Sequence, residues 1–313
     1  MSETAFKLFD ETFREEQGRY QARRIRTRVA EARRSLPSAG PRWPFELLQN
    51  ALDSGPRVGN SSVGIRLSSE ETKVAFEHDG IPFTTSDLTA LLSGGSNKDF
   101  ESEETTGRFG TGFLVTHVLA ERTSLSGLLK TPNGYERFDL LLDRGGDEDA
   151  ILQNMKDCRE AIRSANPVSD LDGVESARFE YHTADNNPLT LGIASLRSAL
   201  PYLYATRQIL GRVELRNGVN EREVWTPADV TAQVLQDGHL EERSIIVNRN
   251  GTDLPEIRVF RFMTRQQGLA SALVLAERTH EGWKVVPLEP NACRVYREYP
   301  LSGSGFLPTN FIL

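Results

Sequence analysis

The chain has 313 residues, of which 38% are hydrophobic and 26% charged, and its formal net charge is −7. This composition is that of a globular protein with a real core, and the acidic balance disfavours non-specific nucleic-acid binding through a broad basic face. The sequence has no apolar run of about 18 residues and no signal-peptide h-region, so neither a membrane span nor secretion is predicted. The two cysteines, Cys158 and Cys293, are too few for a disulfide framework or a cysteine zinc site, and we expect reduced thiols in a cytoplasmic protein.

The first 40 residues are predicted to form an N-terminal helical segment. Residues 4–35 read as one helix, in which an apolar stripe is followed by a basic run at 23–28 that is typical of a solvated face. The stripe consists of Phe6, Leu8, Phe9 and Phe13. After a Gly-Pro break, a second helix is predicted from Pro44 to Ser54, because proline suits a first helical turn and Gly55-Pro56 ends it.

Residues 41–190 are predicted to form one α/β domain. Residues 63–67 and 73–77 alternate apolar with polar or small residues, as half-buried strands do. A short helix begins near 85, and residues 93–112 form a long loop rich in Gly, Ser, Thr and acid, which in compact domains is usually functional or disordered. The remaining elements are expected to be helices at 111–121 and 147–163 and strands at 122–130, 135–143 and 178–181.

Residues 191–313 are predicted to form a second α/β domain with a sheet of its own. A helix at 195–210 precedes strands at 212–217, 243–249, 256–263, 272–277 and 283–287. The chain stops at Phe311-Ile312-Leu313, inside what reads as a strand, so we expect a fragment of a longer protein.

The second predicted helix carries a polar stripe on an otherwise apolar surface. Glu46 and Asn50 are four residues apart and Asp53 three further on, so the three share one face. Asn50 offers a neutral oxygen to a hard cation, and Glu46 could activate a water as a general base. ATP with a magnesium ion would be a suitable partner for such a stripe. The alternative is an exposed face with ordinary polar residues.

A second candidate lies at the end of the second strand, where Asp79 and Gly80 follow His78. A carboxylate there can accept the amino hydrogen of adenine, and a glycine lets the base approach the backbone. The alternatives are a plain Asp-Gly turn and, for His78, a structural role, since no second histidine lies at metal-ligand spacing.

A third candidate is a glycine loop that opens a helix, with glycines in the order GxxGxG. Its backbone N–H groups could hold phosphate oxygens, and it is neither a P-loop nor a dinucleotide fingerprint. The loop comprises Gly107, Arg108, Phe109, Gly110, Thr111, Gly112 and Phe113. Upstream, Ser96 and Lys98 could reach terminal phosphates. The alternatives are a flexible linker and a solvated loop lysine.

The order of these motifs resembles that of the GHKL (Bergerat-fold) ATPases, which include heat-shock-ninety chaperones, the gyrase ATPase subunit, MutL, MORC proteins and histidine kinases. Residues 46–113 carry the resemblance. Within the superfamily, their motifs resemble the sacsin-like branch most closely. It implies Glu46 as catalytic glutamate, Asn50 as magnesium ligand and Asp79-Gly80 as the adenine-reading motif. It also implies a lid over residues 91–112 with a Ser96–Lys98 element, and it adds Asp53 and the glycine loop to the ATP site.

The sequence departs from this family at the adenine motif, because the run His78-Asp79-Gly80-Ile81-Pro82 lacks the second glycine. His78 could therefore occupy the aspartate slot, although a carboxylate is the better acceptor for the adenine amino group and favours Asp79. The threonine that the family places beside adenine has no clear match, and Ser176 and Thr183 are the candidates.

The resemblance implies a two-layer α/β sandwich (the Bergerat ATP-binding fold) followed by a transducer-like α/β domain that we expect to be truncated, with ATP and Mg²⁺ as cofactors. The implied function is ATP binding with slow hydrolysis, which drives lid closure and conformational change or homodimerisation. The alternative is a nucleotide-gated binding module for a client protein or nucleic acid, with little hydrolysis. A histidine kinase is disfavoured because none of the five histidines precedes Asn50.

Overall fold

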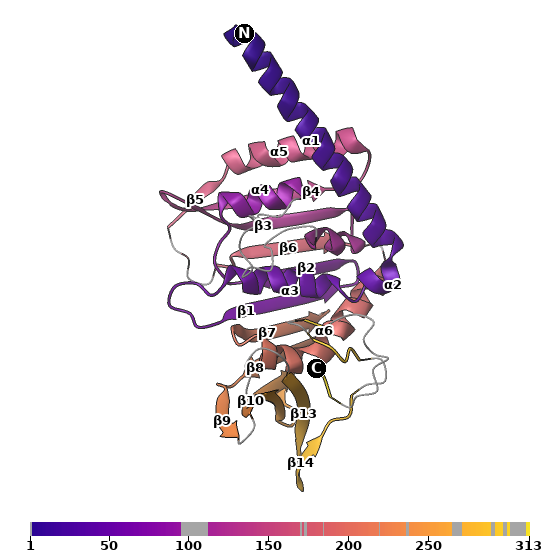
Figure 1. Cartoon of the computed structure of the whole chain (residues 1–313), viewed down its shortest axis with the longest axis vertical. Coiled ribbons are helices and arrows are strands. Elements are labelled where there is room, and N and C mark those ends of the chain that lie inside the picture. The colour runs from indigo at the N-terminus through magenta and orange to yellow at the C-terminus, as the bar shows by residue number, and fades with distance from the viewer. Residues whose placement is uncertain are drawn as a thin grey trace.

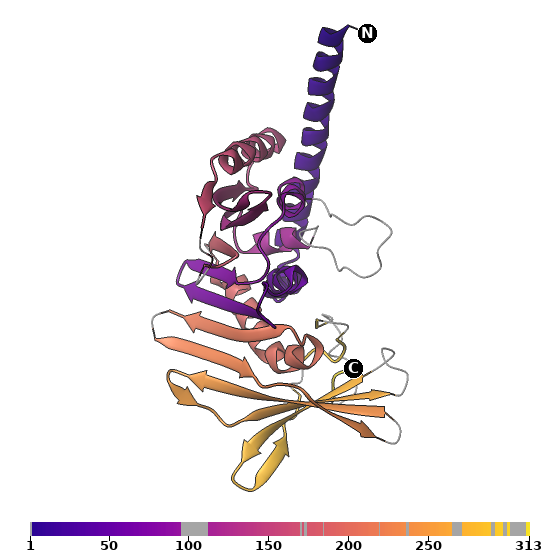
Figure 2. The same ribbon diagram turned by 90° about the vertical axis from the view of Figure 1, so that its left-hand side faces the viewer.

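The protein is a mixed α/β structure with one large twisted sheet and helices gathered mainly on one of its faces (Figures 1 and 2). This confirms the predicted α/β class. The computed structural model describes residues 2–94, 112–169, 171, 174–183, 185–218, 220–235, 238–264, 271–288, 292–296, 299–300 and 311–313. No helix within these ranges is long and apolar enough to cross a membrane.

The helices follow the predicted order. They are α1 Glu3–Arg34, α2 Leu36–Ala39, α3 Trp43–Ser54, α4 Thr85–Ser93, the 3₁₀ helix η1 Phe113–Val118, α5 Glu148–Arg163 and α6 Asn186–Thr206. The predicted helix at 195–210 thus begins nine residues earlier than expected, and the domain boundary placed near residue 190 falls inside α6.

The strands include four that sequence periodicity did not predict, namely β5, β8, β9 and β11. In chain order they are β1 Val63–Glu70, β2 Lys73–His78, β3 Arg122–Thr131, β4 Gly134–Asp143, β5 Asn166–Val168, β6 Ala177–His182, β7 Leu210–Asn217, β8 Glu221–Pro227, β9 Thr231–Leu235, β10 Gly238–Arg249, β11 Thr252–Asp253, β12 Ile257–Thr264, β13 Ser271–Thr279 and β14 Gly282–Val285.

Local signals explain the two helices nearest the candidate site. In α3, Pro44 occupies the first turn, and the chain leaves the helix at Gly55, whose φ of 78° favours glycine. In α4, Thr84 and Asp87 form a capping box, in which each side chain accepts the other's backbone N–H. Gly94, in the left-handed conformation, ends α4.

The sheet is continuous through the described strands, in the order β14-β13-β12-β10-β8-β7-β1-β2-β6-β3-β4-β5, with β9 and β11 paired to β10. The junction between the two halves of the chain is the parallel pair β1–β7, in which Ile65 lies beside Val213 and Leu67 beside Leu215. The prediction of a separate second sheet is therefore wrong: β7 adds to the free edge of β1, which sequence periodicity cannot indicate.

Strand alternation divides the sheet into two unlike faces. On β1, alternate residues from Val63 to Ser69 are buried, and Ile65 and Leu67 belong to the core beneath the helices. The intervening residues, such as Arg66, point to the opposite face. α3 and α6 lie on the core face (Figure 2), where buried Trp43 donates from Nε1 to the carbonyl of Pro188 at 2.9 Å.

Helix α1 is apolar on opposite faces in its two halves. Its second half packs on the protein through Ala22, Ile25 and Val29, whereas its first half projects beyond the rest of the molecule (Figure 1). Phe9 and Phe13 on the first half are more than half exposed and stack on each other. Phe13 and Ala22 are nine residues apart, which turns them about 180° from each other around the helix axis. Phe6, Phe9 and Phe13 of the predicted stripe therefore face away from the body, whereas Leu8 is turned at least about 100° from them around the helix axis.

Candidate functional site

Helix α3 holds Glu46 and Asn50 on one side, as the sequence predicts. Asn50 is buried, with 6% of its surface exposed. Glu46 is an ion pair partner of Arg42 at 3.0 Å. A Cβ atom on Gly112 would overlap the Glu46 carboxylate, so the backbone approaches this carboxylate as closely as only glycine allows. The structure thus brings Glu46 together with the last glycine of the predicted phosphate loop.

The other predicted phosphate-binding residues lie outside the described residues. These are Ser96 and Lys98 of the predicted lid, and Gly107, Arg108, Phe109, Gly110 and Thr111 of the glycine loop. The side chain of Phe113 is buried in the core. The centroid of its ring lies 5.5 Å from the ring centroid of Phe179 and 5.7 Å from that of His117. Burial lowers the pKa of His117 to about 3, so this histidine is a neutral core residue at physiological pH.

Asp53 lies on the same side of α3 as Glu46, because seven residues make almost two full turns of a helix. Its carboxylate, however, has a partner in the C-terminal half of the chain. Arg207 donates from Nη2 to Asp53 Oδ1 at 3.1 Å, and both side chains are largely buried. Asp53 therefore joins α3 to the end of α6.

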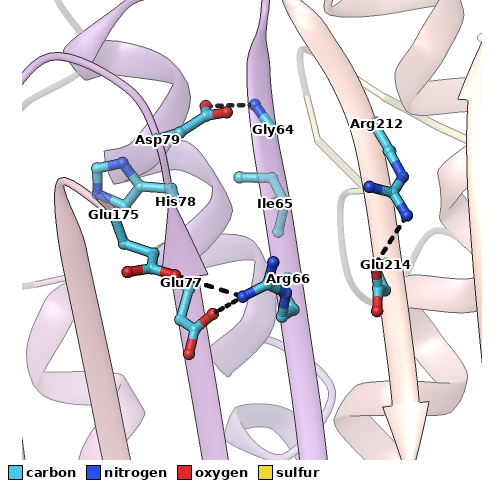
Figure 3. A pocket seen from close by; sticks show the side chains of 9 residues that line it. All are labelled: Gly64, Ile65, Arg66, Glu77, His78, Asp79, Glu175, Arg212 and Glu214. Carbon is cyan, nitrogen blue, oxygen red and sulfur yellow. Dashed lines mark hydrogen bonds and ion pairs between the residues drawn. The ribbon is translucent and has the colours of Figure 1, made fainter. Parts of the chain in front are cut away.

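His78 and Asp79, the two candidates for the adenine-reading position, point to opposite faces of the sheet. His78 pairs with Ile65 on the core face, and it lines a small cavity with Asn50, Ser54 and Asp87. Asp79 instead accepts from the N–H of Gly64 at 2.6 Å (Figure 3). Because side chains alternate along a strand, the residue that faces helix α3 is His78 and the predicted adenine ligand Asp79 is not.

Gly80 lies against the end of α3, and a Cβ at this position would overlap Ser54 Oγ and approach the carbonyl of Gly55 within 2.9 Å. Ser176 Oγ donates to the carbonyl of Gly80. Thr183 lies at the other end of β6, where its N–H donates to the carbonyl of Thr72. Of the two candidates for the late hydroxyl residue, Ser176 is the one beside the Asp79-Gly80 turn.

Arg57 joins three segments around this turn. Its Nε donates to the carbonyl of Gly80 at 3.3 Å and to Ser176 Oγ at 3.0 Å. Its Nη1 and Nη2 donate to the carbonyls of Leu171 and Val174. Burial lowers the pKa of Arg57 from its ordinary value. Sequence reasoning missed Arg57, because it follows Gly55-Pro56 and no helical spacing relates it to Asn50.

The cavity between α3 and the end of β2 is about 10 Å³ and is lined by Asn50, Ser54, His78, Ile81, Pro82, Phe83 and Asp87. Such a volume holds about one water molecule, so a nucleotide base enters it only when one of its walls moves. Asp87 could have been found in the sequence, since Thr84-x-x-Asp87 is a capping-box pattern.

A hollow of about 740 Å³ lies elsewhere, between α1, α4 and α5, with Leu88, Leu92 and Met155 among its lining residues.

Within the described residues, no group of three or more His, Cys, Asp and Glu side chains could hold a metal ion by itself. Asn50 supplies one oxygen of the kind that Mg²⁺ prefers, and Mg²⁺ is commonly held by one or two protein groups together with substrate phosphates. The donor set around Asn50 therefore fits a magnesium ion that arrives with a nucleotide.

A hollow of about 140 Å³ surrounds Asp79 on the other face of the sheet (Figure 3). It contains Arg66 bound to Glu77 at 2.8 Å and Glu214, which is paired with Arg212, Arg216 and Arg222. Hydrogen bonds and charge from Arg222 and then Arg216 lower the pKa of Glu214 to about 2. These charges satisfy one another, so this face is a structural ion-pair network.

No family model matches the sequence, and no curated protein matches it. Among solved structures, the B subunit of DNA gyrase from Myxococcus xanthus is similar at 13% identity with a TM-score of 0.38, over 66% of this chain and 60% of that one. The ATPase region of Saccharomyces cerevisiae topoisomerase II is similar at 15% identity with a TM-score of 0.34, over 60% of this chain and 57% of that one. The chain thus spans about three fifths of each, and likeness at this level establishes neither a family nor an activity.

Replacement of Arg57 by methionine is expected to lower the free energy of unfolding by about 2 kcal/mol, because the carbonyls of Gly80, Leu171 and Val174 lose a charged donor. Urea denaturation measures the change. Arg163→Met removes an exposed arginine that, among the described residues, pairs with neighbouring Glu160, and it should stay within about 0.5 kcal/mol of wild type. Equal stability of Arg57→Met and Arg163→Met would contradict the bridging role.

The pKa of Glu214 predicts a pH dependence. Its folded value of about 2 lies below the ordinary 4.5, so its ionised form stabilises the protein above pH 4.5 and this contribution is lost as the pH falls towards 2. Glu214→Gln should be less stable than wild type at pH 7, and the difference should shrink below pH 4.5. Urea midpoints from pH 7 to pH 3 test this, with exposed Glu70→Gln as the control for one lost charge. A pH-independent difference would contradict it.

Proposed function

We propose that this chain binds ATP with Mg²⁺ along helix α3 in a GHKL-type site. The observation that carries the proposal is the arrangement at the two ends of this helix. Gly112 touches the Glu46 carboxylate at the first end, and Gly80 touches Ser54 at the second. Ser54 lies eight positions after Glu46, which corresponds to about 12 Å along the axis. This length suits a nucleoside triphosphate with its phosphates near Glu46 and its base near Gly80.

In this proposal, Asn50 supplies an oxygen to the magnesium ion, and Glu46 accepts a proton from the water that attacks the terminal phosphate. The Gly107–Gly112 loop would hold phosphate oxygens with its N–H groups, with Ser96 and Lys98 reaching the terminal phosphates. Arg42, paired with Glu46 at 3.0 Å, keeps this carboxylate oriented before a nucleotide arrives. Hydrolysis and lid closure belong to the same proposal.

The competing function is a nucleotide-gated binding module with little hydrolysis. It is favoured if the C-terminal half supplies no basic group to the terminal phosphate, since such charge stabilises phosphoryl transfer. Binding and turnover therefore have to be measured separately.

Asn50→Ala is expected to weaken Mg²⁺-dependent ATP binding at least about tenfold, because a magnesium ligand is lost. Glu46→Gln should bind ATP almost normally but hydrolyse it roughly 100-fold more slowly, the usual cost of losing a general base. Calorimetry with ATP and Mg²⁺, and phosphate release, are the measurements.

Gln153→Ala, on the exposed side of α5, is the control for both measurements. A folded wild type that binds no ATP would overturn the proposed function. Binding without measurable turnover in wild type would support the nucleotide-gated module.

We also propose that α1 mediates homodimerisation when nucleotide is bound. Phe6, Phe9 and Phe13 follow the three-and-four spacing of a two-helix interface, and all three are more than half exposed. The stripe faces away from the body of its own chain, so a second copy of α1 could cover it.

The triple variant Phe6→Ser, Phe9→Ser, Phe13→Ser should sediment as a monomer with a non-hydrolysable ATP analogue, under conditions in which wild type forms a dimer. Leu8→Ser is the matched control, because Leu8 is also more than half exposed but points to a different side of the helix from Phe6, Phe9 and Phe13. Wild type that stays monomeric with the bound analogue would exclude this role of α1.

A further inference from the structure

His78 occupies the position at which a residue of β2 faces helix α3. Its side chain is 4% exposed, and it lines the same small cavity as Asn50, Ser54 and Asp87. Asp79 is held on the other face by the N–H of Gly64, and a Cβ on Gly64 would lie 2.7 Å from the Asp79 carboxylate. This tight contact leaves His78 as the group at the end of β2 that can meet a base beneath α3.

The hydrogen bond from Gly80 indicates which ring nitrogen of His78 carries the proton. The N–H of Gly80 donates to His78 Nδ1 at 3.3 Å. A nitrogen that accepts a hydrogen bond has no proton of its own, so the neutral ring is protonated at Nε2. Gly80 is held in place by its contact with Ser54, where no Cβ would fit, and by the Arg57 and Ser176 hydrogen bonds to its carbonyl.

This tautomer changes what the site can recognise. A carboxylate only accepts hydrogen bonds, and it would read the 6-amino group of adenine as a donor. An imidazole protonated at Nε2 donates, and it requires an acceptor on the base. Adenine offers N1 beside its amino group, and 6-oxopurines offer O6 at the same edge.

We propose that His78 is the base-reading residue of the nucleotide site and selects purine nucleotides by an acceptor at the N1–O6 edge, so that the 6-amino group is dispensable. This inference rests on the proposed ATP site. It assigns Asn50 and Glu46 to the magnesium and phosphate end and His78 to the base end of the same helix.

Two ATP analogues separate the possibilities. Purine riboside triphosphate lacks the 6-amino group but keeps N1, and 1-deaza-ATP keeps the amino group but lacks N1. Wild type is expected to bind purine riboside triphosphate within about threefold of ATP and 1-deaza-ATP at least about tenfold more weakly, the loss that one buried hydrogen bond produces. A tenfold loss with purine riboside triphosphate and none with 1-deaza-ATP would overturn the inference.

His78→Asp should reverse this selectivity, so that ATP binds at least about tenfold better than purine riboside triphosphate. Asp79→Asn should leave the ratio as in wild type, because Asp79 lies on the other face. An altered ratio in Asp79→Asn but not in His78→Asp would assign base reading to Asp79. If neither ATP nor either analogue binds folded wild type, the proposed ATP site itself fails, which is a different outcome from a wrong ratio.

A direct measurement on wild type is independent of how well a buried carboxylate at position 78 is tolerated. Nitrogen-15 NMR of the histidine-labelled protein, with His78→Gln used to identify the signal, distinguishes the two neutral tautomers. Protonation at Nε2 is expected. Protonation at Nδ1 would overturn the inference, because the Gly80 N–H could not then donate to this atom.

Discussion

The packing of helix α3 on the sheet is the constraint on which the candidate site depends. Leu47, Leu48 and Leu52 are each about 1% exposed and fix the rotation of the helix, so that Glu46 and Asn50 emerge on one side. Both ends are then joined to the C-terminal half of the chain. At the start, Trp43 donates to Pro188, and Gly192 approaches the Trp43 ring more closely than any residue with a Cβ could. At the end, Asp53 pairs with Arg207.

In the proposed nucleotide site, the strict alternation of a strand decides which side chain would meet the base. Moving the register by one residue exchanges His78 for Asp79, and with it a donor for an acceptor. The same alternation gives the sheet an apolar face beneath the helices and an opposite face of paired arginines and glutamates, exemplified by Arg66–Glu77. Asp79 belongs to this second face, where its partner is a backbone N–H.

The sequence predicted those features that depend on local chemistry. Helices α3 and α4 begin and end at Pro, Thr, Asp and Gly signals that act within one turn, and the β1–β2 hairpin follows from alternation. The pairing of Asp53 with Arg207 joins residues 154 positions apart, and the parallel β1–β7 contact is equally non-local, so neither could be read from spacing. Strands β8 and β9 were not predicted because polar residues interrupt the alternation of apolar residues along them. The role of Arg57 depends on a turn in which three distant segments meet.

The β1–β7 pair has a mechanical consequence. Because hydrogen-bonded strands run without a break from β5 to β14, the described part of the molecule offers no flexible joint at which its C-terminal half could swing as a rigid body. If the C-terminal strands rotate, the twist of the whole continuous sheet must change, and β1 lies near the centre of that sheet. Helix α3 packs on the sheet beside β1. Its first residue contacts α6 through Trp43 and Pro188, and its end contacts Arg207 through Asp53. A torque applied to β8–β14 would therefore change the spacing between α3 and β2 directly, and with it the width of the cavity lined by Asn50 and His78.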